Sequence, residues 1–208
     1  REIMKLLLTG CTGFIGRELI PLLIKEGHSL TVISRQSKVK LKDRANHQGI
    51  KVIQMNPAES SSWNKEEIQN TLNNCEGVIN LAGEPIAEKR WTGDHCKEIT
   101  NSRLETTRNL IKNLCNLKNP PKVLVNASAI GFYGSHPQIE FTETSIPGDD
   151  FLANVCKEWE SFAKNKPRAT RLVIVRIGIV LAKDGGALGK MLPIFRSGLG
   201  GPIGDGKQ

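Results

Sequence analysis

The sequence predicts an α/β fold built on a doubly wound parallel sheet, and three observations predict it. Short apolar segments rich in β-branched residues alternate with longer segments of helical periodicity. A glycine-rich turn at residues 9–16 joins the first of these apolar segments to the first helical one. A later apolar segment, 77–83, ends at a glycine, as a strand can at the ligand-binding edge of such a sheet.

The first strand and the first helix flank the glycine turn. Residues 3–8 form an apolar run that predicts a short buried strand. Residues 15–27 predict a helix, because apolar side chains recur there at helical spacing and Gly27 supplies a stop signal. The apolar positions of this helix are Ile15, Leu19, Leu22 and Leu23.

The turn itself has the composition of a phosphate-binding loop. Gly10 permits a tight turn, Gly13 lets the backbone approach a pyrophosphate, and Gly16 lets the helix pack close to the strand. The helix N-terminus adds N–H donors and a partial positive charge. The spacing is GxxGxxG instead of GxGxxG, so the turn matches the general fingerprint loosely. Between a strand and a helix, it predicts the phosphate end of a dinucleotide site.

The second strand, predicted at 29–34, leads into the most informative single residue. At this tip a carboxylate binds a ribose 2′-hydroxyl, whereas an arginine accommodates a 2′-phosphate. The pair here is Ser34-Arg35, with no carboxylate. The alternative is an exposed arginine in a loop that already holds three lysines. We favour the phosphate interpretation, in which the guanidinium binds bidentately and Ser34 donates a hydrogen bond, and therefore predict NADP over NAD.

The rest of the chain repeats the alternation of strand and helix. The end of the strand at 77–83 is expected at the crevice beside the cofactor, where Leu81, Ala82 and Gly83 would line it through backbone contacts. The alternative for these three residues is a core strand and its turn. Further strands are predicted at 50–55, 122–127 and 172–181, and helices from 63 and over 98–114 and 151–164.

Composition bounds the class of protein. With 208 residues, 38% of them hydrophobic and 24% charged, the chain suits one α/β domain, or that domain plus a fragment of another. The given N-terminus lacks the apolar length and the small-residue cleavage pattern of a secretory signal, so no signal peptide is expected, and no apolar stretch approaches the length of a membrane span. Five scattered cysteines without a CxxC pair predict reduced thiols and a cytoplasmic location. The four histidines show no ligand spacing, so no metal site is predicted.

The net charge of +8 allows an anionic partner or a lysine-rich solvated surface, and we favour the surface. The basic residues form no long run, and only 5% of residues are aromatic, too few for base-stacking platforms. Neither nucleic acid nor a membrane is therefore expected as a partner.

Five segments taken together resemble a known family. They are TGCTGFIG (9–16), ISR (33–35), VINLAGEPI (78–86), NSRLETTRNL (101–110) and VRIGIVLAKDGGALGKMLPIFRSGLGGPIGDG (175–206). The combination resembles the epimerase-like branch of the short-chain dehydrogenase/reductase superfamily. It is most similar to the group labelled predicted nucleoside-diphosphate-sugar epimerases or cell-division inhibitors, and the match covers essentially the whole chain.

The resemblance implies an NADP-binding Rossmann domain over 1–181 and the start of a smaller C-terminal substrate domain over 182–208. Members normally continue past the position where this chain ends, so most of the substrate domain is expected outside these residues. Arg103 enters as a cofactor contact through the resemblance alone; otherwise it reads as a helical arginine coating a surface. The cofactor contacts implied are Gly10, Thr12, Gly13, Phe14, Ile15, Ser34, Arg35, Leu81, Ala82 and Arg103, with Glu98 and Val180 as further candidates.

The sequence departs from the superfamily where the chemistry is expected. Relatives use a tyrosine and a lysine four residues later, with a serine that polarises the substrate carbonyl. This chain has a single tyrosine, Tyr133, and no YxxxK pair. Where relatives place that pair, this chain has Phe151, Leu152, Cys156 and Lys157.

Three candidates for the chemistry remain. Ser128 follows a strand and could donate to a carbonyl, although its register relative to the superfamily's serine is uncertain by one residue. Tyr133 is an alternative acid, or a ring packed in its loop with a bonded hydroxyl. Lys157 is an alternative to the missing lysine, or a solvated surface residue.

Two functions are therefore open. The first is an NADP-dependent oxidoreductase or sugar-nucleotide epimerase-like enzyme with a non-standard proton donor, acting on a nucleotide sugar or another carbonyl compound. The second is a catalytically silent NADP-binding regulatory or interaction protein, linked to cell or plastid division by the label attached to relatives. The fold alone does not choose between them.

Overall fold

A computed structural model describes residues 2–36, 50–136, 138–183, 185–202 and 206. The chain divides into two compact units, Arg1–Arg176 and Ile177–Gln208. The lysine-bearing loop that follows Arg35 lies outside the described residues. Within the part of the chain that the structure describes, no helix has the length and apolarity needed to cross a membrane.

The first unit is a six-stranded sheet whose strand order confirms the doubly wound prediction. The order is β3-β2-β1-β4-β5-β6, so the chain builds outward from β1 first on one side and then on the other. β1 pairs in parallel with β2 and β4, β2 with β3, and β4 with β5. The strands are β1 (Lys5–Thr9), β2 (Ser29–Ser34), β3 (Ile50–Gln54), β4 (Gly77–Asn80), β5 (Val123–Ala129) and β6 (Arg171–Ile177).

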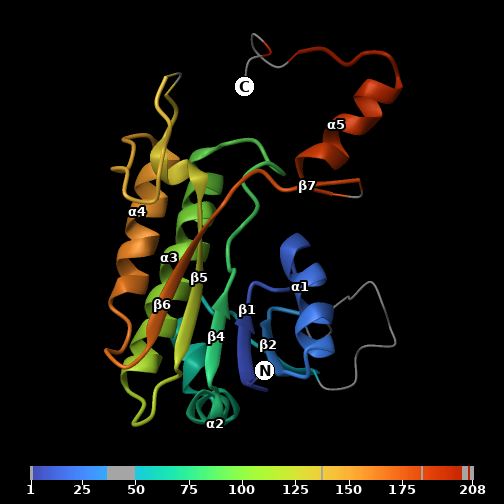
Figure 1. The fold of residues 1–208 in the computed structure, drawn as a ribbon. Coiled ribbons are helices and arrows are strands. Elements are labelled where there is room, and N and C mark those ends of the chain that lie inside the picture. The colour runs from blue at the N-terminus through green and yellow to red at the C-terminus, as the bar shows by residue number, and fades with distance from the viewer. Residues whose placement is uncertain (1, 37–49, 137, 184, 203–205, 207–208) are drawn as a thin grey trace. The chain divides into compact units, whose positions relative to one another are not determined.

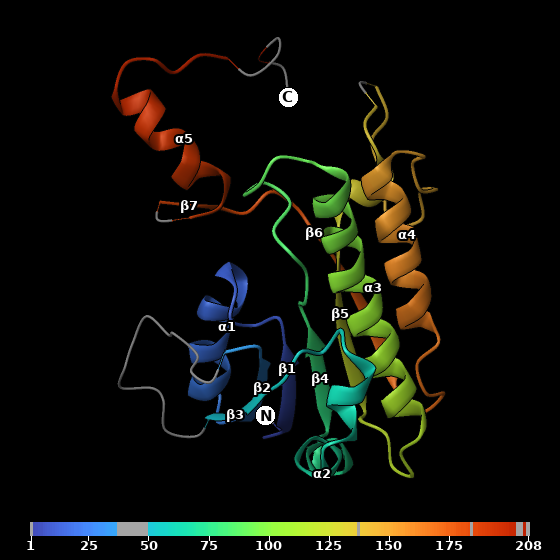
Figure 2. The same cartoon turned by 180° about the vertical axis from the view of Figure 1, so that it is seen from behind.

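Helices cover both faces of this sheet. Figures 1 and 2 show α1 on one face, with α3 and α4 side by side on the other. The long connections that hold these helices allow neighbouring strands to run in parallel. The helices are α1 (Phe14–Lys25), α2 (Glu66–Asn74), α3 (Gly93–Cys115) and α4 (Phe151–Lys164), with 3₁₀ turns η2 (Ser60–Asn64) and η3 (Ile130–Tyr133).

The core consists of two layers, one on each face of the sheet. Leu6 and Leu8 of β1 pack in the cluster that includes Ile20 of α1. Leu7 points to the opposite layer, with Leu110 of α3 and residues of α2. Side chains that alternate between two buried faces explain why β1 reads as a continuous apolar run and not as an alternating one.

Three element predictions need correction. The strand predicted at 172–181 ends at Ile177, and its residues are half-buried or exposed, so the apolar run does not mark a fully buried strand. On α1, Leu22 is 60% exposed while Ile20 carries the contact with the core. α3 begins at Gly93, ahead of the predicted 98, because the Thr92 side chain accepts a hydrogen bond from the His95 N–H and caps it.

The second unit is small. It contains β7 (Leu181–Ala182) and α5 (Gly186–Arg196). Leu181 bridges to Gly186 and Ala182 to Gly185, both antiparallel, which forms a tight hairpin before the helix. The boundary at Ile177 separates two compact parts of the chain and does not identify what the second part binds. The assignment of 182–208 to a substrate domain stays a prediction.

Candidate functional site

The glycine turn brings β1 and β4 together at the point where the strand order reverses. Gly10 has a φ of +73°, and a side chain there would overlap the backbone of Leu81 and Ala82. A side chain on Gly16 would overlap the backbone of Cys11. Both glycines are therefore required by close approach, and the turn lies at the switch point where such sheets bind ligands.

The first turn of α1 is built to accept an anion. Its N-cap, Gly13, supplies no side-chain hydrogen bond, and no acidic residue lies in the first turn. Thr12 and Gly13 are exposed, while Phe14 and Ile15 are half-buried. The backbone N–H groups at this helix end thus keep their partial positive charge, which fits a pyrophosphate.

At the tip of β2 the two predicted residues behave differently. Ser34 is buried, and its Oγ accepts a hydrogen bond from the Gln36 N–H at 2.9 Å. Arg35 is exposed, with 74% of its side chain accessible, and its carbonyl oxygen accepts a hydrogen bond from Gln54 Nε2 at 3.2 Å. The backbone at this tip is thus held while the guanidinium extends into solvent, within 3.9 Å of Glu84 Oε2.

The turn after β4 is fixed from beneath by Asn80, which sequence reasoning missed. Its Nδ2 donates to Thr107 Oγ1 at 2.9 Å and to Asn126 Oδ1 at 2.7 Å, and its Oδ1 accepts from the Ala82 N–H at 3.2 Å. Ala82 is buried, Leu81 half-buried and Gly83 exposed. A polar residue at the end of an apolar strand was the available signal, because a buried amide needs partners.

Arg103 supports this same turn. Its Nη1 donates to the carbonyl oxygens of Glu84 and Ile99, each at 3.0 Å, and its guanidinium lies 5.4 Å from the Trp159 ring. Burial lowers the pKa of Arg103. A side chain on Gly83 would come within 2.8 Å of the guanidinium carbon, so the arginine lies directly against that glycine. Its predicted contact with a cofactor stays a prediction.

The other two candidates from the family pattern are Glu98 and Val180. Glu98 is exposed on α3, where its Oε2 is 3.0 Å from Lys89 Nζ and 3.3 Å from His95 Nδ1. Hydrogen bonds from Lys89 and then His95 lower the pKa of Glu98. Val180 belongs to the second unit, and its carbonyl oxygen accepts the Ala187 N–H at 3.1 Å.

Glu84, His95 and Glu98 have the composition of a metal site. One ligand atom from each lies within 4.8 Å of the others. Lys89 Nζ, however, is 3.2 Å from Glu84 Oε1 and 3.0 Å from Glu98 Oε2. The chain's own ammonium group is therefore bonded to both carboxylates and supplies the positive charge that a metal would bring.

Two of the three candidates for catalysis are hydrogen-bonded to other side chains, and the third is exposed. Ser128 is buried, and its hydroxyl donates to Glu160 Oε1 at 2.7 Å. The Tyr133 hydroxyl accepts from Arg176 Nη1 at 2.9 Å, and its ring stacks on Phe141. Lys157 is exposed on α4.

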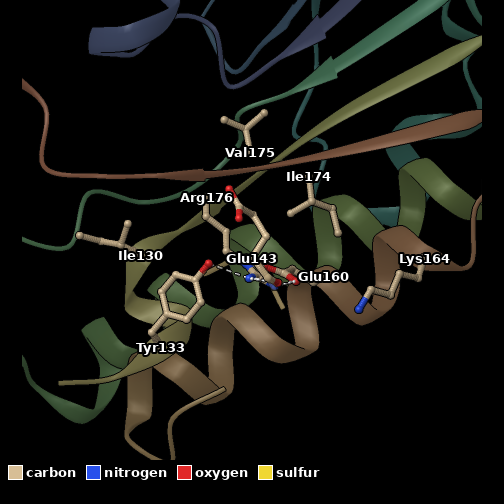
Figure 3. Close-up of a pocket in the computed structure, with 8 residues that line it drawn as sticks. All are labelled: Ile130, Tyr133, Glu143, Glu160, Lys164, Ile174, Val175 and Arg176. Carbon is tan, nitrogen blue, oxygen red and sulfur yellow. Dashed lines mark hydrogen bonds and ion pairs between the residues drawn. The ribbon is translucent and has the colours of Figure 1, made fainter. Parts of the chain in front are cut away.

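Figure 3 shows the ion pair that organises this region, at a cavity of about 480 Å³ between η3, α4 and β6. Arg176 Nε and Nη2 bind the two carboxylate oxygens of Glu160 at 2.8 and 2.9 Å. Arg176 Nη1 also reaches the carbonyl oxygen of Glu143, and the guanidinium lies 3.6 Å from the Phe132 ring. Ser128 and Tyr133 thus both bond to one buried ion pair.

A polar cap and an aromatic contact hold the start of α4, where relatives place the Tyr–Lys pair. Asp150 caps the helix by accepting the Ala153 N–H at 2.8 Å. The Phe151 ring packs edge-on against Trp91, with ring centroids 5.7 Å apart. Burial raises the pKa of the Cys156 thiol, which keeps it protonated.

A known protein family matches the part of the chain that holds these features. The model of the NAD dependent epimerase/dehydratase family matches residues 6–154, which includes the glycine turn, the β2 tip and the turn after β4. The chain belongs to this family. The predicted resemblance is thereby confirmed.

Relatives within the epimerase family cover nearly all of the chain. The chloroplastic Epimerase family protein SDR39U1 homolog of Arabidopsis thaliana is 40% identical over 99% of this chain and 57% of its own length. The human Epimerase family protein SDR39U1 is 38% identical over 99% of this chain and 64% of its own length. The chain thus spans about three fifths of the length of these relatives.

Solved structures of the family have the same fold. A crystal structure of the human protein with NADPH matches with a TM-score of 0.80 and 38% identity, over 99% of this chain and 64% of that one. A nucleoside-diphosphate sugar epimerase from Corynebacterium glutamicum matches with a TM-score of 0.76 and 28% identity, over 98% of this chain and 39% of that one.

Proposed function

We propose that this chain binds NADP(H) at the carboxyl edge of its sheet, as the cofactor-binding part of an NADP-dependent oxidoreductase or sugar-nucleotide epimerase-like enzyme. The observation that carries the proposal is the exposed Arg35 guanidinium at the tip of β2, on the same edge as the uncapped N-terminus of α1. A human relative that is 38% identical was crystallised with NADPH, which supports the same cofactor here.

Each part of the crevice has a role in this proposal. The backbone N–H groups of Phe14 and Ile15 would bind the pyrophosphate, and Arg35 the 2′-phosphate. Leu81, Ala82 and Gly83 would line the dinucleotide with backbone and small groups. When bound, the nicotinamide supplies hydride transfer to or from a carbonyl carbon, and the substrate would be a nucleotide sugar or another carbonyl compound.

Replacement of one residue tests the cofactor. Arg35→Ala removes the charge-assisted hydrogen bonds to the 2′-phosphate, so the dissociation constant for NADPH should rise about tenfold or more while that for NADH changes little. Isothermal titration calorimetry measures both. Arg171→Ala is the matched control, because Arg171 is an exposed arginine at the start of β6, on the opposite edge of the sheet. An unchanged NADPH preference in Arg35→Ala would remove Arg35 from this role.

A second candidate function is a catalytically silent NADP-binding regulatory or interaction protein. The engagement of the Ser128 hydroxyl by Glu160 favours it, because the proton that would polarise a carbonyl is already donated. The two candidates differ in turnover. Oxidation of NADPH by simple aldehydes or ketones, or epimerisation of UDP-glucose in the presence of NADP+, supports the enzyme. Tight NADPH binding with neither reaction supports the silent protein.

The compartment belongs with these proposals. We propose a cytoplasmic location from the five cysteines, none of which forms a disulfide. The Arabidopsis thaliana relative is chloroplastic by its name, so a plastid is the alternative location. Localisation of a tagged protein by microscopy distinguishes the two.

A further inference from the structure

Glu84 lies just after the β4 turn, and its main chain is held in place by two hydrogen bonds. Its backbone N–H donates to Ser102 Oγ at 2.8 Å, and its carbonyl oxygen accepts from Arg103 Nη1 at 3.0 Å. Both partners belong to α3, so the main chain at Glu84 is fixed to that helix. Only 18% of the Glu84 side chain is exposed.

This carboxylate belongs to a row of alternating charges. Arg35 Nη2 lies 3.9 Å from Glu84 Oε2, Lys89 Nζ lies 3.2 Å from Glu84 Oε1, and the same Lys89 Nζ lies 3.0 Å from Glu98 Oε2. Arg35 is the most exposed of the four and makes the longest contact. An exposed pair at this distance holds the guanidinium only weakly, so orienting Arg35 is a minor part of what Glu84 does.

We propose that Glu84 determines cofactor specificity by opposing a phosphate at Arg35, and that Lys89 limits this opposition. The inference rests on the proposed function. A phosphate bound to Arg35 would share one guanidinium with the Glu84 carboxylate, so the two anions would lie closer than the screening length of about 8 Å at physiological ionic strength. The repulsion acts on a 2′-phosphate and is absent for a 2′-hydroxyl.

Lys89 determines how strong the repulsion is. Its ammonium group is bonded to the Glu84 carboxylate on the side away from Arg35's contact atom, since it binds Oε1 while Arg35 approaches Oε2. Removing Lys89 leaves the negative charge of Glu84 uncompensated beside the phosphate. Glu84 and Lys89 therefore shift the preference between NADPH and NADH in opposite directions.

Two variants test the signs. Glu84→Gln keeps the shape and removes the charge, so NADPH should bind about threefold to tenfold more tightly while the affinity for NADH stays within about twofold. Lys89→Met keeps the length of the side chain and should weaken NADPH binding by a similar factor. Glu88→Gln is the matched control, because Glu88 is exposed in the same segment and should leave the ratio unchanged. Calorimetry at low and at high salt measures all three, and both shifts should shrink at high salt.

The outcomes separate this inference from the proposed function. Weaker NADPH binding in Glu84→Gln, or an unchanged ratio of NADPH to NADH affinity in both variants, overturns the role of Glu84. In that case a wild-type preference for NADPH that Arg35→Ala abolishes would leave the proposed function intact. If the wild-type protein binds neither nucleotide, the proposed function itself is wrong.

Discussion

At Gly10 the backbone conformation and the space around it both exclude a side chain. The residue has a positive φ, and a Cβ added there would overlap main-chain atoms of Leu81 and Ala82. Because these are backbone atoms and not flexible side-chain ends, the overlap is relieved only by separating the loops after β1 and β4. The close contact between the loops after β1 and β4 therefore requires that residue 10 has no side chain.

Gly10→Ala should lower the free energy of unfolding by about 3 kcal/mol, from the strained φ and the overlap together. Urea denaturation measures the loss, and NADPH binding should be lost with it. The control is Gly93→Ala, where no atom lies within 4 Å of the added methyl group. That change should move the free energy of unfolding by less than about 1 kcal/mol. Wild-type stability in Gly10→Ala would contradict the geometry.

Single residues differ in how far the sequence reveals them. Gly10 follows from a local rule, since a tight turn between a strand and a helix demands glycine. The proposed role of Arg35 follows from another, since the residue at the tip of the second strand is expected to meet the cofactor ribose. Asn80 and Glu84 act through partners far away in the chain, on α3 and at the β2 tip. Residue spacing in one sequence does not predict which helix packs over which strand end. The contacts of Asn80 and Glu84 could therefore be found only in the structure.

Among the elements, β5, β6, η3 and α4 are joined by the Glu160–Arg176 pair. Arg176→Ala would leave a carboxylate that is 1% exposed without its cation and would also free Tyr133 and Glu143. The expected loss is about 3 kcal/mol of unfolding free energy, measured by denaturation. Arg108→Ala is the control: it breaks the exposed pair with Glu105 and the contact of the guanidinium with the Phe162 ring, 4.6 Å away, and should cost about 1 kcal/mol. Equal costs for the two variants would contradict a buried pair.

The same pair predicts how stability depends on pH. Burial alone would raise the pKa of Glu160, but the hydrogen bonds from Arg176 and Ser128 outweigh it and hold the pKa below its ordinary 4.5. A carboxyl whose pKa is lower in the folded state stabilises the fold above its unfolded pKa, and this contribution is lost as pH falls through the folded value. Denaturation measured at a series of pH values from 7 to 3 gives the free energy of unfolding at each pH. Below pH 4.5 this free energy should fall less steeply with pH for Glu160→Gln than for the wild type. Identical slopes would show that the pair is not coupled to folding.

The sequence predicted elements best where burial and periodicity agree. The predicted limits 29–34 and 151–164 are those of β2 and α4, an alternating strand and a helix capped by Asp150. It failed for β6, because a run of branched apolar residues reads as buried even when the strand is largely half-exposed. The early start of α3 was missed since Thr92 precedes a polar first turn that shows no apolar periodicity.

For the molecule as a whole, every group assigned to the nucleotide apart from Val180 lies in the first unit, so ligand binding should report on the stability of that unit. NADPH at about 100 times its dissociation constant should add about 2.7 kcal/mol and raise the unfolding midpoint by about 5 °C or more. Differential scanning calorimetry measures the shift, and NADH at the same concentration should give a smaller one. No shift with either nucleotide would contradict a site in the folded unit.

The overall architecture was predictable because its rules are local. A parallel sheet wound outward from β1 follows from alternating strands and helices, and the crevice follows from the strand order. The second unit was harder to foresee, since glycine clusters from 183 onward indicate turns without defining a hairpin or a helix.

The three tryptophans differ sharply in their surroundings. Trp63 and Trp159 are buried in the first unit, whereas Trp91, in the segment that begins at Glu84, is 48% exposed and fixed by its bond to the Ile86 carbonyl oxygen. Acrylamide added to the solution therefore quenches the emission of one indole and spares two. The protein therefore carries a built-in optical reporter for the segment beside the proposed nucleotide site, with no dye attached.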